Sequence, residues 1–164
     1  MKMQTFDFSL SQETRTIEAQ STFGPGCYVL YQNKAIARLG AIDAKGILYI
    51  GKGDNIFHRV NSLKRSVLDN CRNNPQPLLR GHQTLSKKIF RIQKFIAVEL
   101  LRINILIPNN MDDARHLESY LLESYVSKYG ELPPLNGQYG SFSLADSIRY
   151  LEFSGIDIRE IDFI

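Results

Sequence analysis

A small set of tyrosines, cations and carboxylates holds the chemistry that this chain could perform. Tyr28 lies in GCYVLY, Tyr49 lies in ILYIGKG, and Arg59 and Glu123 follow further along the chain. An arginine offers a rigid fork of donors for phosphate oxygens, and a carboxylate binds Mg²⁺ through oxygen. Each residue alone is more often structural, because strand tyrosines usually pack in the core. Their joint order is what favours a functional site.

The glycines around Tyr49 nearly match a phosphate-binding P-loop. Residues 46–53 read GILYIGKG. A P-loop needs serine or threonine at the last position, where its hydroxyl reaches magnesium, and this chain has Gly53 there. The residues in between also form a hydrophobic strand pattern rather than a loop. We therefore exclude the P-loop interpretation.

The ordered set resembles the GIY-YIG nuclease family. The matching stretches are GCYVLY, LYIGKGDNIFHRV and LLESYVSKYGELPPLN, spread over residues 26–136. YIG alone is common in proteins, and the more specific signal is the order YIG-K-x(6)-R followed by E-x(12)-N. The resemblance implies a small α/β fold and metal-dependent hydrolysis of phosphodiester bonds in double-stranded DNA.

The resemblance also implies individual roles. Tyr28 would be the general base, and Tyr49 beside it would orient water or phosphate. A phenol with a pKa near 10 is a poor base, and a nearby metal ion or cation makes its phenolate accessible. Arg59 and Lys52 would bind the phosphate oxygens as negative charge develops.

Two glutamates in the longest predicted helix compete for the metal. Glu118 and Glu123 are five residues apart, so on a helix they point about 140° away from each other and only one can face the site. The spacing to Asn136 selects Glu123 as the ligand of one Mg²⁺ ion, with Mn²⁺ as an alternative. Asn136 would brace the site rather than react. We expect Glu123 to approach Tyr28 and Arg59 in space.

The chain departs from the family pattern at three places. Cys27 stands where the family name has isoleucine, and a core cysteine should be harmless there. The segment 32–46 must form an enlarged hairpin. Many members carry a histidine four residues after the arginine, and this chain has Leu63 at that position.

Hydrophobic periodicity and turn residues predict the elements that position these side chains. Strands are expected weakly at 3–10 and then at 26–31, 47–51 and 97–107, and helices at 55–67, from about 86, at 112–129 and at 143–153. Asp54 and Ser143 are the expected caps of two helices, the turn at 109–113 is expected to cap the longest helix, and Gly130 ends that helix. The expected fold is α/β, with a small antiparallel sheet flanked by helices and with 26–31 and 47–51 as a hairpin.

A single domain with insertions follows from this order of elements. Residues 1–25 are expected as an N-terminal arm and residues 26–136 as the core. A basic insertion at about 64–95 interrupts the core, and residues 137–164 are expected as a C-terminal extension packed on it.

Charge is distributed unevenly along the 164 residues. The segment from Lys52 to Arg102 holds eleven basic and three acidic residues, a net of +8, and the segment from Asp112 to the end nets −6. A basic middle segment favours a surface for a polyanion. The expected DNA-binding cations are Lys64, Arg65, Arg80, Lys87, Lys88 and Arg91.

Two details qualify the prediction of a basic surface. The loop residues Asn73, Asn74 and Gln76 could read base edges in the major groove. The competing interpretation is a solvated helix face opposite the apolar residues Leu85, Ile89, Ile92 and Ile96.

Composition limits the remaining classes. No apolar run approaches the roughly 18 residues of a membrane span, and the N-terminus lacks a signal peptide, so we expect a cytoplasmic protein without a membrane partner. Two cysteines, Cys27 and Cys71, exclude a four-cysteine zinc site. The compact chain most resembles the type II restriction enzymes of the family, for which a homodimer is expected. The alternatives are a repair or mobile-element nuclease and a non-catalytic nucleic-acid-binding module.

Overall fold

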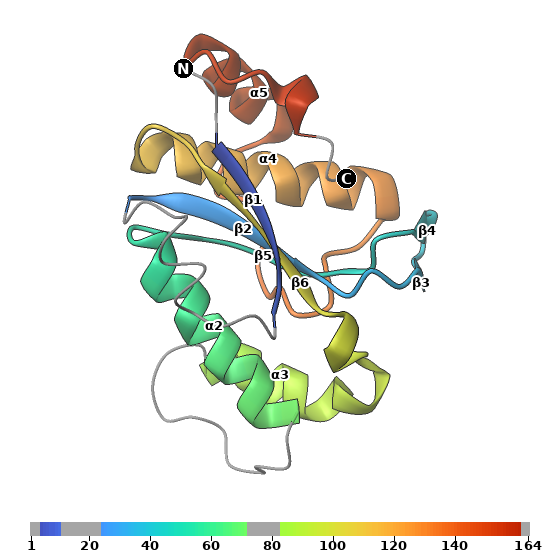
Figure 1. Ribbon diagram of the computed structural model, residues 1–164. Coiled ribbons are helices and arrows are strands. Elements are labelled where there is room, and N and C mark those ends of the chain that lie inside the picture. Colours follow the sequence, from blue (N-terminus) through green and yellow to red (C-terminus); the bar gives the residue numbers. More distant parts are fainter. Residues whose placement is uncertain (1–3, 11–23, 72–82, 162–164) are drawn as a thin grey trace.

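Four strands form one antiparallel sheet in the computed structural model, which describes residues 4–10, 24–71 and 83–161. The strand order is β1-β6-β2-β5 (Figure 1). The strands are β1 (Gln4–Ser9), β2 (Gly26–Tyr31), β5 (Ile47–Gly53) and β6 (Arg102–Ile107). Strand β2 lies in the interior of the sheet between β6 and β5, so the sheet positions the two motif strands as neighbours.

Helices cover both faces of this sheet (Figure 1). On one face lie α2 (Ile56–Cys71) and α3 (Gln83–Ile92), and on the other lie α4 (Met111–Tyr129) and α5 (Leu144–Phe153). The short 3-10 helices η1 (Gln93–Phe95) and η2 (Val98–Leu100) connect α3 to β6, and η3 (Ile158–Glu160) follows α5. The predicted α/β class with a small antiparallel sheet is confirmed.

Side chains of β2 point alternately into two hydrophobic cores, one on each face of the sheet. Tyr28 and Leu30 belong to the core under α2 and α3. Cys27 and Val29 belong to the core under α4 and α5. Successive side chains of a strand point to opposite faces, so a strand covered on both sides is apolar throughout. This explains why GCYVLY shows no alternation of apolar and polar residues.

The enlarged hairpin between β2 and β5 has its own small sheet. Strands β3 (Ile36–Ala37) and β4 (Ile42–Asp43) pair with each other beside the main sheet. The buried Asp43 carboxylate accepts hydrogen bonds from Gly46 N at 2.9 Å and Ile47 N at 2.8 Å. It also accepts one from the Tyr125 hydroxyl at 2.8 Å, so a charged turn residue fastens the insertion to α4.

The predicted hairpin of 26–31 and 47–51 is confirmed, because β2 and β5 pair in antiparallel register. Two local predictions are wrong. The strand expected from residue 97 begins only at Arg102, because η2 occupies residues 98–100. Asp54 was expected to cap the first helix. Instead, the Asn55 side chain accepts a hydrogen bond from His58 N, in the first turn of α2, at 3.1 Å.

The remaining helix boundaries follow the predicted caps more closely. Helix α4 begins after Asn110, whose side chain accepts from Asp113 N, and its C-cap is Gly130. The N-cap Asn110 lies within the turn at 109–113 that was expected to cap this helix. Helix α5 begins after Ser143, whose hydroxyl accepts from Asp146 N. Short polar side chains at these positions satisfy N–H groups that the helix itself leaves without partners.

The two ends of the chain both contribute to the folded unit. Residues 4–9 of the expected arm pair with β6 as β1, and residues 11–23 lie outside the described part. Leu151 of α5 is buried in the core beneath α4. Among the described residues, no helix combines the length and the apolar character that crossing a membrane requires.

Candidate active site

Gly51 allows the two motif tyrosines to meet on one face of the sheet. A Cβ atom at Gly51 would lie 2.7 Å from the Tyr49 ring and 2.8 Å from the Tyr28 hydroxyl, inside van der Waals contact. The ring centroids of Tyr28 and Tyr49 are 5.9 Å apart. Position 51 therefore requires glycine for steric reasons, because a side chain there would clash with both rings.

The two phenols differ in their access to solvent. Tyr28 is fully buried, and burial raises its pKa well above the ordinary value, while the nearby Arg59 lowers the pKa by a smaller amount. Tyr49 is partly exposed; burial also raises its pKa, and Arg59 again opposes the shift. Both phenols are therefore neutral at physiological pH. The position of Tyr28 does not suit its expected role as the general base, because of the two phenols only that of Tyr49 is open to solvent.

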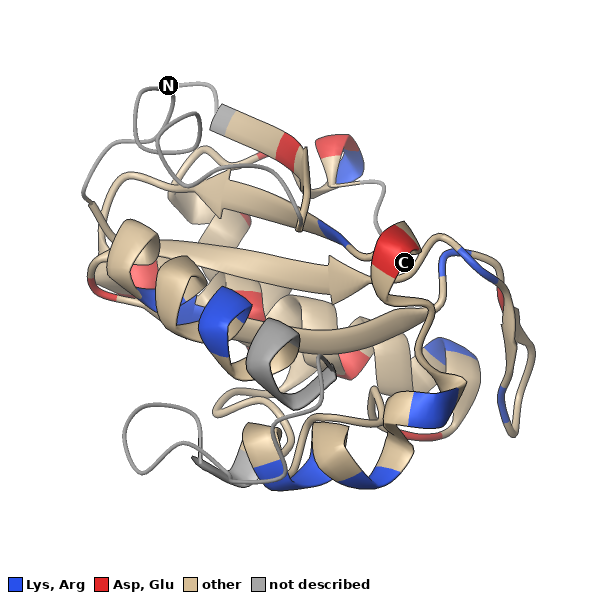
Figure 2. Cartoon of the chain, turned by 60° about the horizontal axis from the view of Figure 1, so that its bottom comes forward, with Lys and Arg blue, Asp and Glu red and all other residues tan. Residues whose placement is uncertain are grey.

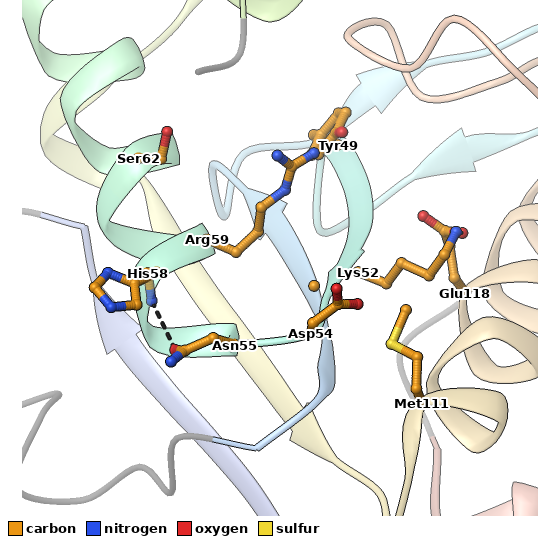
Figure 3. A pocket seen from close by; sticks show the side chains of 10 residues that line it. Tyr49, Lys52, Asp54, Asn55, His58, Arg59, Ser62, Met111 and Glu118 are labelled. Atoms are coloured by element: carbon orange, nitrogen blue, oxygen red, sulfur yellow. Dashed lines mark hydrogen bonds and ion pairs between the residues drawn. The ribbon is translucent and has the colours of Figure 1, made fainter. Parts of the chain in front are cut away.

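Helix α2 brings Arg59 to the tyrosines. Arg59 lies in the first turn, where its N–H bonds to Asn55 O at 3.1 Å. Figure 3 shows its side chain extending toward Tyr49, and His58 on another side of the helix. Leu63, at the position where a family histidine was considered, is buried in the core. The arginine therefore faces the strand motif as its order in the sequence suggested.

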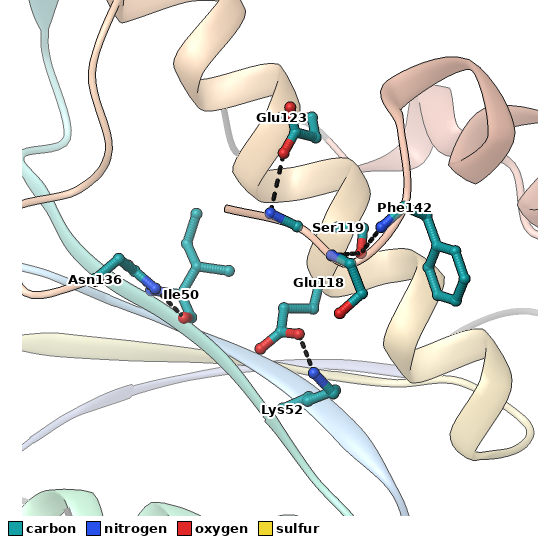
Figure 4. Close-up of polar contacts among 9 residues, drawn as sticks. Ile50, Lys52, Glu118, Ser119, Glu123, Asn136 and Phe142 are labelled. Carbon is teal, nitrogen blue, oxygen red and sulfur yellow. Dashed lines mark hydrogen bonds and ion pairs between the residues drawn. The ribbon is translucent and has the colours of Figure 1, made fainter. Parts of the chain in front are cut away.

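Two cavities meet at four polar residues. One cavity, of about 560 Å³, also contains Asp54, Asn55 and Ser62. The other, of about 550 Å³, also contains Asn136, Gln138 and Tyr139. The four residues that line both are Tyr49, Lys52, Arg59 and Glu118. The Lys52 ammonium forms an ion pair with Glu118 at this junction (Figures 3 and 4).

The carboxylate of α4 that reaches this junction is that of Glu118 rather than Glu123. Glu123 Oε1 instead accepts a hydrogen bond from Gly140 N at 2.9 Å, on the side of the helix facing the segment after Asn136 (Figure 4). Among the described residues, Glu118 lines both cavities and Glu123 lines neither. The expected approach of Glu123 to Tyr28 and Arg59 is thus corrected. Spacing to Asn136 does not determine the phase of α4, because the turn at 130–135 lies between them.

Asn136 braces the YIG strand. Its Oδ1 accepts from Ile50 N at 2.9 Å, and its Nδ2 donates to Ile50 O at 2.7 Å. The preceding Leu135 N donates to Leu48 O at 2.9 Å. Strand β5 is at the edge of the sheet, so these bonds occupy main-chain groups that would otherwise be open there. Asn136 is thereby fixed against the main chain of Ile50.

The donor set around the junction fits a hard divalent ion. The first cavity is lined by two residues with carboxylates, Glu118 and Asp54, and by Tyr49, which carries a hydroxyl. Magnesium in phosphate-processing sites is usually held by one or two carboxylates, with water and substrate phosphate filling the other positions. The Lys52 ammonium pairs with Glu118 in this structure, so this ion pair would have to open before Glu118 could hold an ion. No cluster of three or more metal-binding side chains occurs among the described residues.

The expected DNA-binding cations divide into two groups. Lys87 and Arg91 are exposed on α3, and Arg65 is exposed on α2. Figure 2 shows lysines and arginines along α3 and on α2, on the same side of the sheet. Lys88 is instead half-buried and donates to Asn136 O at 2.5 Å. Arg80 and the loop residues Asn73, Asn74 and Gln76 lie outside the described part of the chain, and Lys64 is half-buried.

Two contributors to the site were missed in the sequence. Asp54 was assigned only as a cap, although its position directly after YIGKG placed it at the strand end. The segment 137–142, GQYGSF, carried no signal beyond an aromatic between two glycines.

Comparison of this chain with protein-family models, curated proteins and solved structures finds no match.

Proposed function

We propose that this protein is a metal-dependent endonuclease that hydrolyses phosphodiester bonds in DNA. The observation that carries the proposal is the meeting of Tyr49, Lys52, Arg59 and Glu118 at the junction of two open cavities. An arginine fork, an ammonium and a carboxylate around one point form a set suited to a phosphate bridged to a divalent ion.

Each residue has a distinct task in this proposal. Arg59 and Lys52 bind the non-bridging oxygens and stabilise the negative charge that develops on them. Tyr49 orients the attacking water. The buried Tyr28 lies beside Tyr49 and Arg59 and helps to hold them in position. Glu118 holds the divalent ion, which when bound supplies charge neutralisation and a water of lowered pKa.

The reaction exchanges one bond to phosphorus for another. A bond forms between the water oxygen and phosphorus, and the bond from phosphorus to the leaving sugar oxygen breaks. The water loses a proton and the leaving oxygen gains one. The products are a phosphomonoester end and a hydroxyl end.

Site-specific cutting by a homodimer, as in a type II restriction enzyme, is the form of this activity that we propose. Twofold symmetry of a dimer would match a palindromic site. A binding module without catalysis is the second candidate, and the Lys52–Glu118 ion pair favours it because that pair already neutralises both groups.

Plasmid cleavage with and without Mg²⁺ separates these candidates. Discrete bands identify a site-specific enzyme, nicks or smears identify a repair or mobile-element type of nuclease, and binding without cutting identifies the module. We expect Arg59→Ala to lower the cleavage rate by about 10²–10³-fold, the usual loss for one charge-stabilising donor. Arg149→Ala, an exposed arginine of α5, is the matched control and should cut normally.

A further inference from the structure

The segment 137–142 is a loop that is attached to α4 and lines one cavity of the proposed site. Gly140 N donates to Glu123 Oε1 at 2.9 Å, and Ser141 N and Phe142 N donate to Ser119 Oγ at 3.0 and 3.3 Å. These bonds attach three successive main-chain groups to one face of α4 (Figure 4). Glu123 therefore has a clear structural task in positioning this loop.

Two further contacts restrict the same loop. A Cβ atom at Gly140 would lie 2.8 Å from the Ser119 Cα, so the main chain rests directly on the helix. The Phe142 ring stacks on the His116 ring with centroids 3.9 Å apart and planes 13° from parallel. The loop is thus held by hydrogen bonds, by close main-chain packing and by an aromatic stack.

Tyr139 is the more exposed of the two aromatic residues in this loop. It is 64% exposed, although Gly140 beside it is attached to α4. It lines the cavity of about 550 Å³ that also contains Tyr49, Lys52 and Arg59. Leu122 and Leu135 give that cavity an apolar part, and Gln138 gives it an amide. Cavities of this size and mixed lining suit a planar ring with polar edges.

We infer that Tyr139 is a stacking platform for a nucleobase next to the phosphate bound at Arg59 and Lys52. The inference rests on the proposed function, because the ligand is a nucleic acid strand that crosses the junction of the two cavities. A rigid aromatic ring loses little conformational freedom on binding, and every base offers a flat face to stack on. The Gln138 amide can pair with an edge of the same base. Glu123 and Ser119 act as positioning residues that hold the platform.

Binding of a DNA oligonucleotide with one 2-aminopurine, in EDTA, tests the platform without cleavage. Fluorescence of this base falls when it stacks on an aromatic ring. We expect wild type to quench the probe at one position along the strand. Tyr139→Ala should lose the quenching and bind about tenfold more weakly, a typical cost of removing one stacked aromatic. Tyr139→Phe should keep both properties, because the ring is retained.

Positioning is tested by a second set of variants. Glu123→Gln keeps an oxygen that can accept from Gly140 N and should quench as wild type does, whereas Glu123→Ala should lose part of the quenching. Phe153, 91% exposed on α5, supplies the control Phe153→Ala, which should change nothing. Unfolding curves of the same variants show whether each is folded.

The outcomes separate the platform from the nuclease. If wild type binds and cuts DNA and Tyr139→Ala quenches as strongly as wild type, the platform is excluded and the nuclease stands. Quenching that depends on Tyr139 without any cleavage supports the platform and excludes the nuclease. Loss of a dimer in Tyr139→Ala, with base quenching unchanged, would identify the ring as a protein contact instead.

Discussion

The Lys52 ammonium and the Glu118 carboxylate form an ion pair between β5 and α4, where the two cavities meet. Their side chains are 27% and 15% exposed, so the pair is only partly solvated. Glu118 also faces the partly buried Tyr49 closely enough to raise the pKa of that phenol, although less than burial does. The two charges of the pair offset each other, so Arg59 carries the remaining formal charge among the four residues that line both cavities.

Replacement of Glu118 should separate metal binding from DNA binding. We expect Glu118→Gln to abolish Mg²⁺-dependent cleavage and to leave DNA affinity in EDTA nearly unchanged, because a metal ligand acts mainly on the chemical step. Single-turnover cleavage and a Mg²⁺ titration followed by Tyr fluorescence measure the two effects.

Glu123→Gln is the matched control for that experiment. It removes a charge from the same helix but keeps an acceptor for Gly140 N, so cleavage should persist. This expectation reverses the assignment that the spacing to Asn136 suggests. An inactive Glu123→Gln beside an active Glu118→Gln would restore Glu123 as the metal ligand.

Asn136→Ala should destabilise the fold and disturb the site together. The variant removes both side-chain hydrogen bonds to the main chain of Ile50, so we expect a loss of about 1–2 kcal/mol in the free energy of unfolding. Urea denaturation measures this loss. Asn109→Ala, in the exposed turn before α4, should stay within about 0.5 kcal/mol of wild type. If the two variants had equal free energies of unfolding, Asn136 would not brace strand β5.

The alkaline limit of stability should depend on Tyr31. Its hydroxyl donates to Asp7, and burial together with this bond raises its pKa from about 10 to about 12. The folded state then keeps a proton that the unfolded state loses, so this contribution is complete below pH 10 and falls as the pH rises through 12. Unfolding of wild type and Tyr31→Phe from pH 8 to 12 measures the difference. A difference that does not change with pH would contradict this linkage.

Exposed cations of α3 should contribute to the salt dependence of DNA binding. Lys87 and Arg91 are exposed, whereas Lys88 is engaged with Asn136 O. The double variant Lys87→Ala/Arg91→Ala should therefore lower the log–log salt slope by about 1.8, at about 0.9 for each lost phosphate contact. Affinity measured across a salt series gives this slope.

Arg115→Ala/Arg149→Ala removes the same charge from α4 and α5, on the other side of the sheet, and serves as the control. Its slope should equal that of wild type. If both double variants lower the slope equally, the effect comes from net charge rather than from a DNA-facing surface.

Several features of the fold could be predicted from local sequence alone. The hairpin of β2 and β5, the helix ending at Gly130 and the Ser143 cap all depend on signals within a few residues. The sequence also predicted that the strands carrying Gly26, Gly51 and the two tyrosines would be neighbours in the sheet, as they are. Such features are decided by backbone preference and by side-chain alternation, which neighbouring residues determine.

The identity of the carboxylate at the site was decided by tertiary structure. Both Glu118 and Glu123 lie on α4, and the sequence by itself determined only that they point apart. Packing of Leu117 and Leu121 against the sheet rotates α4 so that Glu118 meets Lys52. Likewise, only the folded chain buries Tyr28, exposes Tyr139 and turns Glu123 toward Gly140. A helix rotates as a unit to bury its apolar face, so long-range packing rather than residue spacing selects which polar side chain reaches a cavity.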